Sequence, residues 1–445
     1  MKGGSPAAQG VLRNLAAYYA AKSRNPPEPN PLNARRSAAV APLFAGNLAP
    51  ALLDLDAIRA RFPALASGAA FFDGPGGSQV PQQVIDAVTG YLRDSNSNLG
   101  GAFATSRASD EVVERGRAAA ADFMGAEPEG IAFGANMTTL NFQLAHAVAR
   151  TLQPGDEIVV SALDHDANVS PWLIVAEDHD LVVRTAPLRV DDVTLDVDAL
   201  EALLGERTRV VAFTLASNAV GTIPDAARIA AAAHAAGALA WADGVHLAPH
   251  RRLRARELGL DVALCSPYKF FGPHLGIAAI RPDLAESLPA DRVRPAGEDP
   301  PGHRFETGTQ SHEAIAGATA AIEYLRDFGD GDLDAAYDRI EEHETQLAAR
   351  FLSRLPEEIA LYGIRTPEGR TPTFCFNVDG RGPREVAELL AEQDMYVWDG
   401  DYYALEPIRA LGLADTGGAV RAGFLHYTTE DEVDRLLEAL GALVE

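Results

Sequence analysis

From about Leu53 onward, short apolar runs that suit β-strands alternate with stretches that suit helices. This alternation predicts a parallel sheet with helices on both of its faces. Polar residues follow the expected strands, and in such sheets ligands bind beyond the carboxyl ends of the strands. The expected strands lie within GIAFGANMTTLNF, PGDEIVVSALDHDANVSPW, RTRVVAFTLASNAVGTIPD, GALAWADGVHLAPH and DVALCSPYKFFGPHLGIAAI, the last of which holds two strands joined by a turn.

The pattern changes after about residue 312, where a long acidic stretch at 313–355 reads as helix. It leads to the strand-like PTFCFNV, a helix near 383–393, the segments MYVWDG and AVRAGFLHY, and a closing helix. We therefore expect a large domain at 53–312, whose N-terminal segment contributes to a smaller α+β domain at 313–445, with the long helix as the link.

The first 50 residues differ from the rest of the chain because they hold six Lys or Arg residues and one acid, Glu28. They also contain the turn-rich segment PPEPNPLN. A flexible arm over residues 1–52 is the expected form. A helix around residues 10–22 that docks on a partner subunit and an organelle transit peptide are the alternatives.

Composition excludes several classes of partner. The formal net charge of −25 repels nucleic acid and anionic membranes, so neither is expected as a partner. The longest apolar stretch, 226–242, contains Arg228 and reads as a helix followed by a strand rather than as a membrane span. The only cysteines, Cys265 and Cys375, lie in strand-like runs, which indicates no disulfide framework and no metal site and favours a reducing cytoplasm.

Lys269 and Asp243 carry the chemistry of the chain. Lys269 lies in the turn CSPYKFFGPHLG, and Asp243 ends a strand 26 residues upstream. Enzymes that use pyridoxal 5'-phosphate (PLP) need such a pair, because the lysine forms a Schiff base and the aspartate keeps the pyridine nitrogen protonated. The pair predicts a PLP-dependent enzyme.

The sequence resembles the class V aminotransferases, and within them the cysteine desulfurase-like branch, over roughly residues 54–445. The resemblance implies the PLP-dependent transferase fold type I, with a mostly parallel seven-stranded sheet between helices and a smaller α+β C-terminal domain. The motifs that carry it are FFDGPGGSQVP, NMTTLNF, LDHDANVSPW, ASNAVGTIPD, ADGVHLAPH, CSPYKFFGPHLG, RFETGTQSHE and RAGFLHYTTEDEVD.

The resemblance implies roles for residues at the cofactor ring. Lys269 would be both the Schiff-base lysine and the base at Cα, with Asp243 on the pyridine nitrogen. His165 would stack on the ring and assist proton transfer. Asn218 would bond the ring oxygen or the substrate carboxylate, and His246 stands where desulfurases carry a glutamine that touches the same oxygen.

The phosphate would be held by the N–H groups of Met137 and Thr138 at a helix N-terminus. The hydroxyl of Ser266 would add a contact, as would Tyr268, which occupies a position that is histidine in ordinary desulfurases. Gly308 and Thr309 match the segment through which a neighbouring subunit completes this site, so the resemblance implies a homodimer with shared active sites.

Two further features concern the substrate. Arg421 matches the arginine that grips the substrate carboxylate. Trp398, Tyr402 and Tyr403, with Asp399 and Asp401, form an aromatic segment that we expect to shape the pocket for the substrate side chain; packing of the small domain is the alternative.

The chain departs from desulfurases in one decisive respect. These enzymes pass sulfur to a cysteine on a mobile loop, and the corresponding stretch at 398–418 contains none. We therefore expect cleavage of a C–S bond by β-elimination from a cysteine-like amino acid, with release of sulfide or a small thiol. Transamination and racemisation or epimerisation use the same residues and stay open, as does a non-catalytic protein that keeps the fold.

Overall fold

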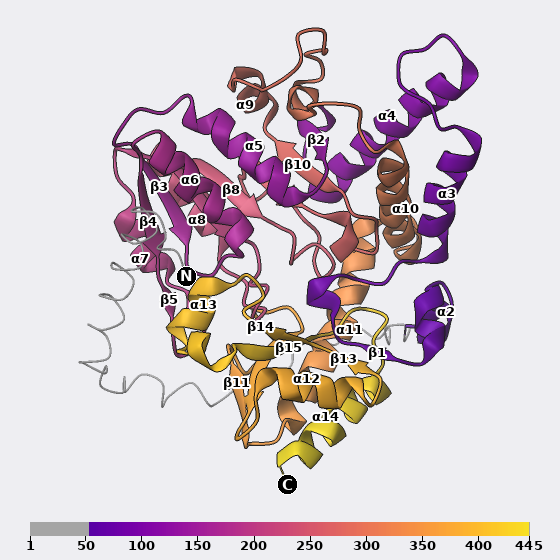
Figure 1. The fold of residues 1–445 in the computed structure, drawn as a ribbon, viewed down its shortest axis with the longest axis vertical. Coiled ribbons are helices and arrows are strands. Elements are labelled where there is room, and N and C mark those ends of the chain that lie inside the picture. Colours follow the sequence, from indigo (N-terminus) through magenta and orange to yellow (C-terminus); the bar gives the residue numbers. More distant parts are fainter. Residues whose placement is uncertain (1–52, 445) are drawn as a thin grey trace, which may run out of the picture.

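The computed structural model describes residues 53–444 (Figure 1). The expectations for the first 52 residues, namely the arm, the helix at 10–22 and the transit peptide, lie outside this range. Two sheets organise the chain, one in the upper part of Figure 1 and one in the lower part. The functional residues predicted above come from both.

The larger sheet has seven strands in the order β2-β10-β9-β8-β7-β3-β4. Only β10 runs antiparallel to its neighbours, so the predicted mostly parallel seven-stranded sheet is confirmed. Strands β3, β9 and β10 are buried along their whole length and β2, β7 and β8 at all but one residue, as expected where helices cover both faces of a sheet. The strands are β2 (Ile131–Gly134), β3 (Glu157–Ser161), β4 (Val182–Ala186), β7 (Thr208–Thr214), β8 (Leu239–Asp243), β9 (Val262–Cys265) and β10 (Gly276–Ile280).

Alternate residues of these strands belong to different hydrophobic cores. Val211 and Phe213 of β7 pack into one core, whereas Val210 and Ala212 pack into the other. Successive side chains of a strand point to opposite faces, so each core covers one face of the sheet. Helices α5 (Met137–Ala149), α6 (Ser170–Asp178) and α9 (Pro282–Ser287) cover one face, and α3 (Gln82–Asp94), α4 (Ala104–Met124), α7 (Val197–Leu203), α8 (Ala226–Ala235) and α10 (His312–Phe328) cover the other.

The long helix expected at 313–355 is two helices, α10 and α11 (Leu333–Arg354). Asp330 and Gly331 interrupt it in left-handed conformations, with φ of 56° and 99°. Gly329 lets the two helices approach, because a Cβ there would lie 2.6 Å from the backbone nitrogen of Ala336. Since α10 packs on α3 and α4, only α11 leads towards the second sheet.

The smaller sheet has four antiparallel strands in the order β11-β12-β15-β14. Its own core includes Phe351 of α11, Phe374 of β12 and Leu436 of α14. Phe72 joins this core from the start of the described chain, where β1 pairs in parallel with β13. The division of the chain into an arm at 1–52, a large domain at 53–312 and a small domain at 313–445 stays a prediction. These elements are β1 (Ala70–Phe71), β11 (Ile359–Tyr362), β12 (Thr373–Val378), β13 (Met395–Tyr396), β14 (Trp398–Gly400), β15 (Ala419–Gly423), α12 (Pro383–Ala391) and α14 (Glu430–Val444).

The remaining elements are short. They comprise α2 (Leu55–Arg59), α13 (Leu405–Ala410) and the two-stranded ribbon of β5 (Leu188–Arg189) and β6 (Thr194–Leu195). Between residues 53 and 444, no helix is long and apolar enough to cross a membrane. The same part of the chain brings together no group of three or more residues suited to hold a metal ion.

Candidate active site

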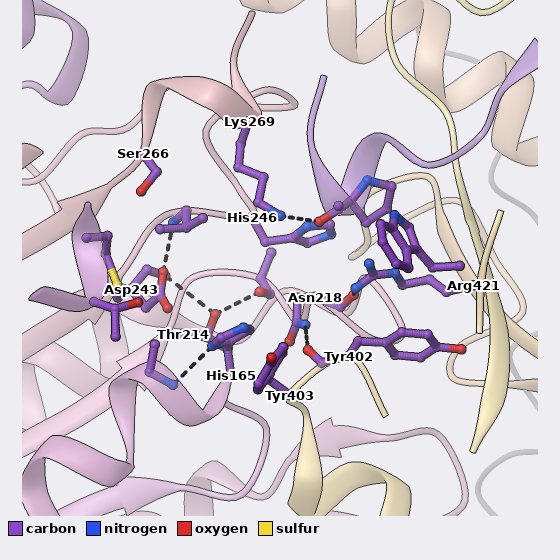
Figure 2. A pocket seen from close by; sticks show the side chains of 18 of the residues that line it. His165, Thr214, Asn218, Asp243, His246, Ser266, Lys269, Tyr402, Tyr403 and Arg421 are labelled. Atoms are coloured by element: carbon purple, nitrogen blue, oxygen red, sulfur yellow. Dashed lines mark hydrogen bonds between the residues drawn. The ribbon is translucent and has the colours of Figure 1, made fainter. Parts of the chain in front are cut away.

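A cavity of about 700 Å³ opens between the two sheets, within the size range of small-molecule and cofactor sites (Figure 2). Fifteen of the seventeen residues predicted from the sequence line it. They are Met137, Thr138, His165, Asn218, Asp243, His246, Ser266, Tyr268, Lys269, Trp398, Asp399, Asp401, Tyr402, Tyr403 and Arg421. Gly308 and Thr309 do not line it and are exposed.

The carboxyl ends of the central strands form the floor of the cavity. Thr214 ends β7 and is the register partner of Asp243 at the end of β8, and Ser266 follows β9 directly. His165 lies in the loop after β3. Because parallel strands end at the same edge of a sheet, residues more than a hundred positions apart meet here.

Asp243 is buried, and its carboxylate accepts a hydrogen bond of 2.9 Å from the backbone N–H of Val245. Burial raises the pKa of Asp243 to about 6. A carboxyl in this state gains from any cation that is placed beside it, because the cation favours the charged form. The site therefore suits a ligand that carries a protonated ring nitrogen.

Lys269 ends a short 3-10 turn (Pro267–Lys269) after β9 and extends into the cavity (Figure 2). Its Nζ donates a hydrogen bond to the backbone oxygen of Pro75. Burial, and after it the positive charge of Arg421, lower the pKa of Lys269 to about 7. A large fraction of this amine is therefore neutral at physiological pH and can attack a carbonyl carbon.

His165 is held in one tautomer. Its Nδ1 accepts a hydrogen bond of 3.0 Å from the backbone N–H of Ala167, so in the neutral ring the proton resides on Nε2. Burial lowers the pKa of His165 to about 4. The ring of Tyr403 lies 5.5 Å from the His165 ring, centroid to centroid. His165 thus offers a neutral N–H donor at the cavity.

Arg421 on β15 is fixed by groups from both sheets. Its guanidinium lies over the ring of Tyr402 at 4.3 Å, and Nη1 donates a hydrogen bond of 2.8 Å to the backbone oxygen of Asn218. The side-chain amide of Asn218 donates in turn to the backbone oxygen of Tyr402 at 2.9 Å. Arg421 Nε and Asn218 Oδ1 are buried without a hydrogen-bond partner among residues 53–444. Two unsatisfied polar atoms thus mark this end of the cavity as a place for a polar ligand.

The start of α5 forms a further corner of the cavity. The Asn136 side chain accepts a hydrogen bond from the N–H of Thr139, which leaves the N–H groups of Met137 and Thr138 in the first turn without an intrahelical acceptor. Gly276 of β10 passes so close that a Cβ there would lie 2.7 Å from the backbone nitrogen of Met137. A helix N-terminus of this kind binds anions.

A protein-family model described as class V aminotransferase matches residues 70–436. The chain belongs to the class V aminotransferase family. The aminotransferase-like protein FGM3 of Gibberella zeae is 32% identical over 405 residues, covering 87% of this chain and 97% of that protein. A cysteine desulfurase of Pectobacterium atrosepticum is 30% identical over 407 residues, with 87% and 97% covered. The apo structure of the cysteine desulfurase from Thermococcus onnurineus NA1 matches with a TM-score of 0.81 at 26% identity, covering 90% of this chain and 99% of that chain.

This class V aminotransferase-family chain is thus a PLP-dependent enzyme, which confirms the predicted family, fold and cofactor. The alternative of a non-catalytic protein is not retained. The residues of the cavity fit the cofactor, since a buried carboxyl, a lysine whose pKa is lowered and a helix N-terminus with free N–H groups surround one space.

Other predicted residues have contacts that the sequence did not indicate. His246 Nε2 lies 3.0 Å from Thr373 Oγ1 of the smaller sheet, and burial lowers the pKa of His246 well below its usual value. Tyr268 stacks on His274 with ring centroids 5.0 Å apart, and Lys269 Nζ lies 4.9 Å from the Tyr268 ring centroid. Tyr268 therefore contacts the lysine side chain as well as lining the cavity.

Asp73 is a candidate that the sequence reasoning missed. Burial raises the pKa of Asp73 to about 6, although the positive charges of Arg421 and Lys269 favour its ionised form. Its Oδ1 is buried without a hydrogen-bond partner in the described part of the chain. The available signal was its place in FFDGPGG, directly before a glycine-rich turn that lines the cavity at Pro75 and Gly76.

Proposed function

We propose that this enzyme cleaves the Cβ–S bond of a cysteine-like amino acid by β-elimination, without a protein thiol. The observation that carries the proposal is the placement of the two cysteines. Cys265 and Cys375 are both fully buried, and neither lines the cavity. Burial raises the pKa of Cys375 to about 12 and that of Cys265 further, so neither is a thiolate that could accept sulfur.

Particular residues would hold the cofactor. Lys269 would bind it covalently and Asp243 would pair with its ring nitrogen, which gives the buried carboxylate its cation. When bound, PLP withdraws electrons from the substrate Cα and so makes the Cα proton acidic. The phosphate would lie at Met137, Thr138, Ser266 and Tyr268, and the ring and its oxygen would contact His165, Asn218 and His246.

Arg421 would bind the substrate carboxylate. Its guanidinium is already oriented by the Tyr402 ring and by the backbone of Asn218, so little side-chain entropy is lost when a carboxylate binds. The free Nε provides a donor that currently has no partner in the described chain. Tyr402 therefore contributes to substrate binding by holding Arg421, and Tyr403 by lining the cavity beside His165.

Lys269 would act as the base and then as the acid. Because its pKa is about 7, its neutral amine can accept the Cα proton and its ammonium can return a proton to the departing sulfur. The Cβ–S bond breaks, and sulfur leaves with the electron pair. With one water, an S-substituted cysteine then yields a thiol, pyruvate and ammonium, so atoms and charge balance.

We also propose a homodimer in which Gly308 and Thr309 of each chain complete the site of the other. Their exposure and their absence from the cavity of a single chain support this arrangement. Two free cysteines without a disulfide support a location in the cytoplasm.

Product analysis tests the proposal. The PLP-loaded protein is mixed with L-cysteine and with S-substituted cysteines, and sulfide or thiol, pyruvate, alanine and loss of Cα deuterium are measured, with Lys269→Ala as the control. Thiol and pyruvate in equal amounts are expected. Alanine with sulfide would establish a desulfurase instead, and deuterium loss without either product would establish a racemase or an aminotransferase.

A further inference from the structure

The segment from Trp398 to Tyr403 borders the cavity, and its aromatic side chains differ in exposure. Tyr402 is 9% exposed and lies beneath Arg421, whereas Trp398 and Tyr403 are 50% and 69% exposed and still line the cavity. In Figure 2, Tyr402 lies beside Arg421 and Tyr403 lies near His165. Two aromatic faces are therefore open to a ligand at the mouth of the cavity.

Charge is distributed unevenly along the cavity. Arg421 is buried and positive at the inner end, and Asp399 and Asp401 lie in the segment at the mouth. Asp399 pairs with Arg384 at 3.3 Å. Asp401 is exposed, its Oδ1 accepts a hydrogen bond of 2.9 Å from the N–H of Tyr403, and it forms no ion pair with any residue between 53 and 444. Within the part of the chain that the structure describes, one carboxylate at the mouth thus has no cationic partner.

The two ends of the cavity are within reach of one small molecule. Trp398 of β14 and Arg421 of β15 are direct partners across the antiparallel pair, and such partners project from the same face of a sheet. A substrate whose carboxylate is bound by Arg421 therefore lies beside Trp398. Aromatic faces next to a carboxylate form a site that favours cations. The negative net charge of the chain attracts cations to it from solution.

We propose that the sulfur substituent of the substrate carries a positive charge and binds between Trp398 and Tyr403 beside Asp401. This inference rests on the proposed C–S lyase function and specifies its substrate class, an S-substituted cysteine with an ammonium or similar cation on the leaving group. The α-carboxylate binds at the positive end of the cavity and the cation binds at the negative end.

The test compares three substrates of similar size: S-(2-aminoethyl)-L-cysteine, S-propyl-L-cysteine and S-carboxymethyl-L-cysteine. The cation is expected to exceed the neutral compound in kcat/KM by about tenfold, from one cation–π contact and one exposed charge pair, and the anion to be the poorest. The preference falls as salt is added, because the mouth is open to solvent.

Two variants locate the preference. Asp401→Asn keeps an acceptor for the Tyr403 N–H and removes only the charge, and Trp398→Leu removes an aromatic face; each is expected to reduce the preference from about tenfold to about threefold. Asp415→Asn is the matched control, because it changes the same charge at an exposed position that does not line the cavity. Calorimetric binding of the three compounds to PLP-loaded Lys269→Ala protein gives a second readout that needs no turnover.

The outcomes separate this inference from the proposed function. Pyruvate from all three compounds at equal kcat/KM would leave the lyase in place and overturn the charge preference. No pyruvate from any of them, with tighter calorimetric binding of the aminoethyl compound, would overturn the lyase and support the cation site. A preference that stays tenfold in Asp401→Asn would also overturn the inference.

Discussion

Replacing Asp243 with asparagine should have opposite effects on the cofactor-free and the PLP-loaded protein. Asparagine keeps an acceptor for the Val245 N–H and removes the buried charge. The pKa of the carboxyl rises from 3.8 to about 6 on folding, which corresponds to about 3 kcal/mol at 1.36 kcal/mol per pKa unit. The cofactor-free protein with Asp243 is destabilised by about this amount above pH 6, so Asp243→Asn should stabilise it.

The direction in which the effect of Asp243 on stability changes with pH follows from proton binding. Between pH 3.8 and about 6 the folded chain holds a proton on Asp243 that the unfolded chain has lost, so this residue lowers stability as the pH rises. The advantage of Asp243→Asn should therefore be about 3 kcal/mol at pH 7.5 and roughly half of that at pH 5. For 445 residues the larger value corresponds to a rise in Tm of about 3 °C.

In the loaded protein the same change should weaken PLP binding roughly 100-fold, because the cation that restores the charged carboxylate loses its partner. The assays are thermal unfolding of the cofactor-free protein at both pH values and titration of PLP by absorbance. Asp225→Asn is the matched control, since Asp225 is an exposed carboxylate that accepts the Arg228 N–H at 3.1 Å, and asparagine caps a helix as well as aspartate. A loss of stability in the cofactor-free Asp243→Asn protein at pH 7.5 would refute the reasoning and make Asp243 a turn-forming residue.

Three further predictions concern single positions. In cofactor-free protein the amine of Lys269 should react with an acylating reagent with a midpoint near pH 7 rather than near 10.5, as mapped by peptide mass spectrometry over a pH series; a midpoint near 10.5 would contradict its burial. Tyr402→Leu should raise the KM for the amino acid about threefold to tenfold with PLP absorbance unchanged, whereas Tyr402→Phe, which keeps the ring beneath Arg421, should not; equal KM values in both variants would contradict this. Gly276→Ala should weaken PLP binding at least tenfold, since the new Cβ meets the backbone at Asn136 and forces the start of α5 to move, and unchanged affinity in an absorbance titration would show that the phosphate binds elsewhere.

Six strands of the large sheet were predictable because each is a short, mostly apolar run followed by polar residues of the site; β4 was not identified, because Arg184 and Thr185 interrupt its apolar run. Local composition also placed Asp243 and Lys269, since Asp243 is the last residue of β8 and Lys269 ends the short turn that follows β9. The break between α10 and α11 was missed although the turn Gly329-Asp330-Gly331 was a visible signal, because the helix-like stretches on its two sides were read as one. Asp73 was missed for a different reason: the charges that act on it belong to residues about 200 and 350 positions away.

The aromatic segment shows where prediction from composition stops. Three aromatic residues within six positions indicated either a specificity element or core packing; all three line the cavity, with Tyr402 buried beneath Arg421 and Trp398 and Tyr403 exposed. Tyr402 and Tyr403 both adopt positive φ, at 56° and 57°. No sequence pattern indicates that two successive tyrosines do so.

The attachment of this segment has a consequence for how the enzyme could be redesigned. The backbone oxygen of Tyr402 accepts from the Asn218 amide, and that of Tyr403 accepts from the N–H of Asp166 at 2.7 Å, so main-chain oxygens tie the segment to the larger sheet. The side chain at position 403 is consequently free to vary without releasing the segment. A mutant library at this position should tolerate glycine and asparagine, which adopt positive φ readily, and reject valine and isoleucine. New leaving groups could then be selected on an unchanged catalytic scaffold.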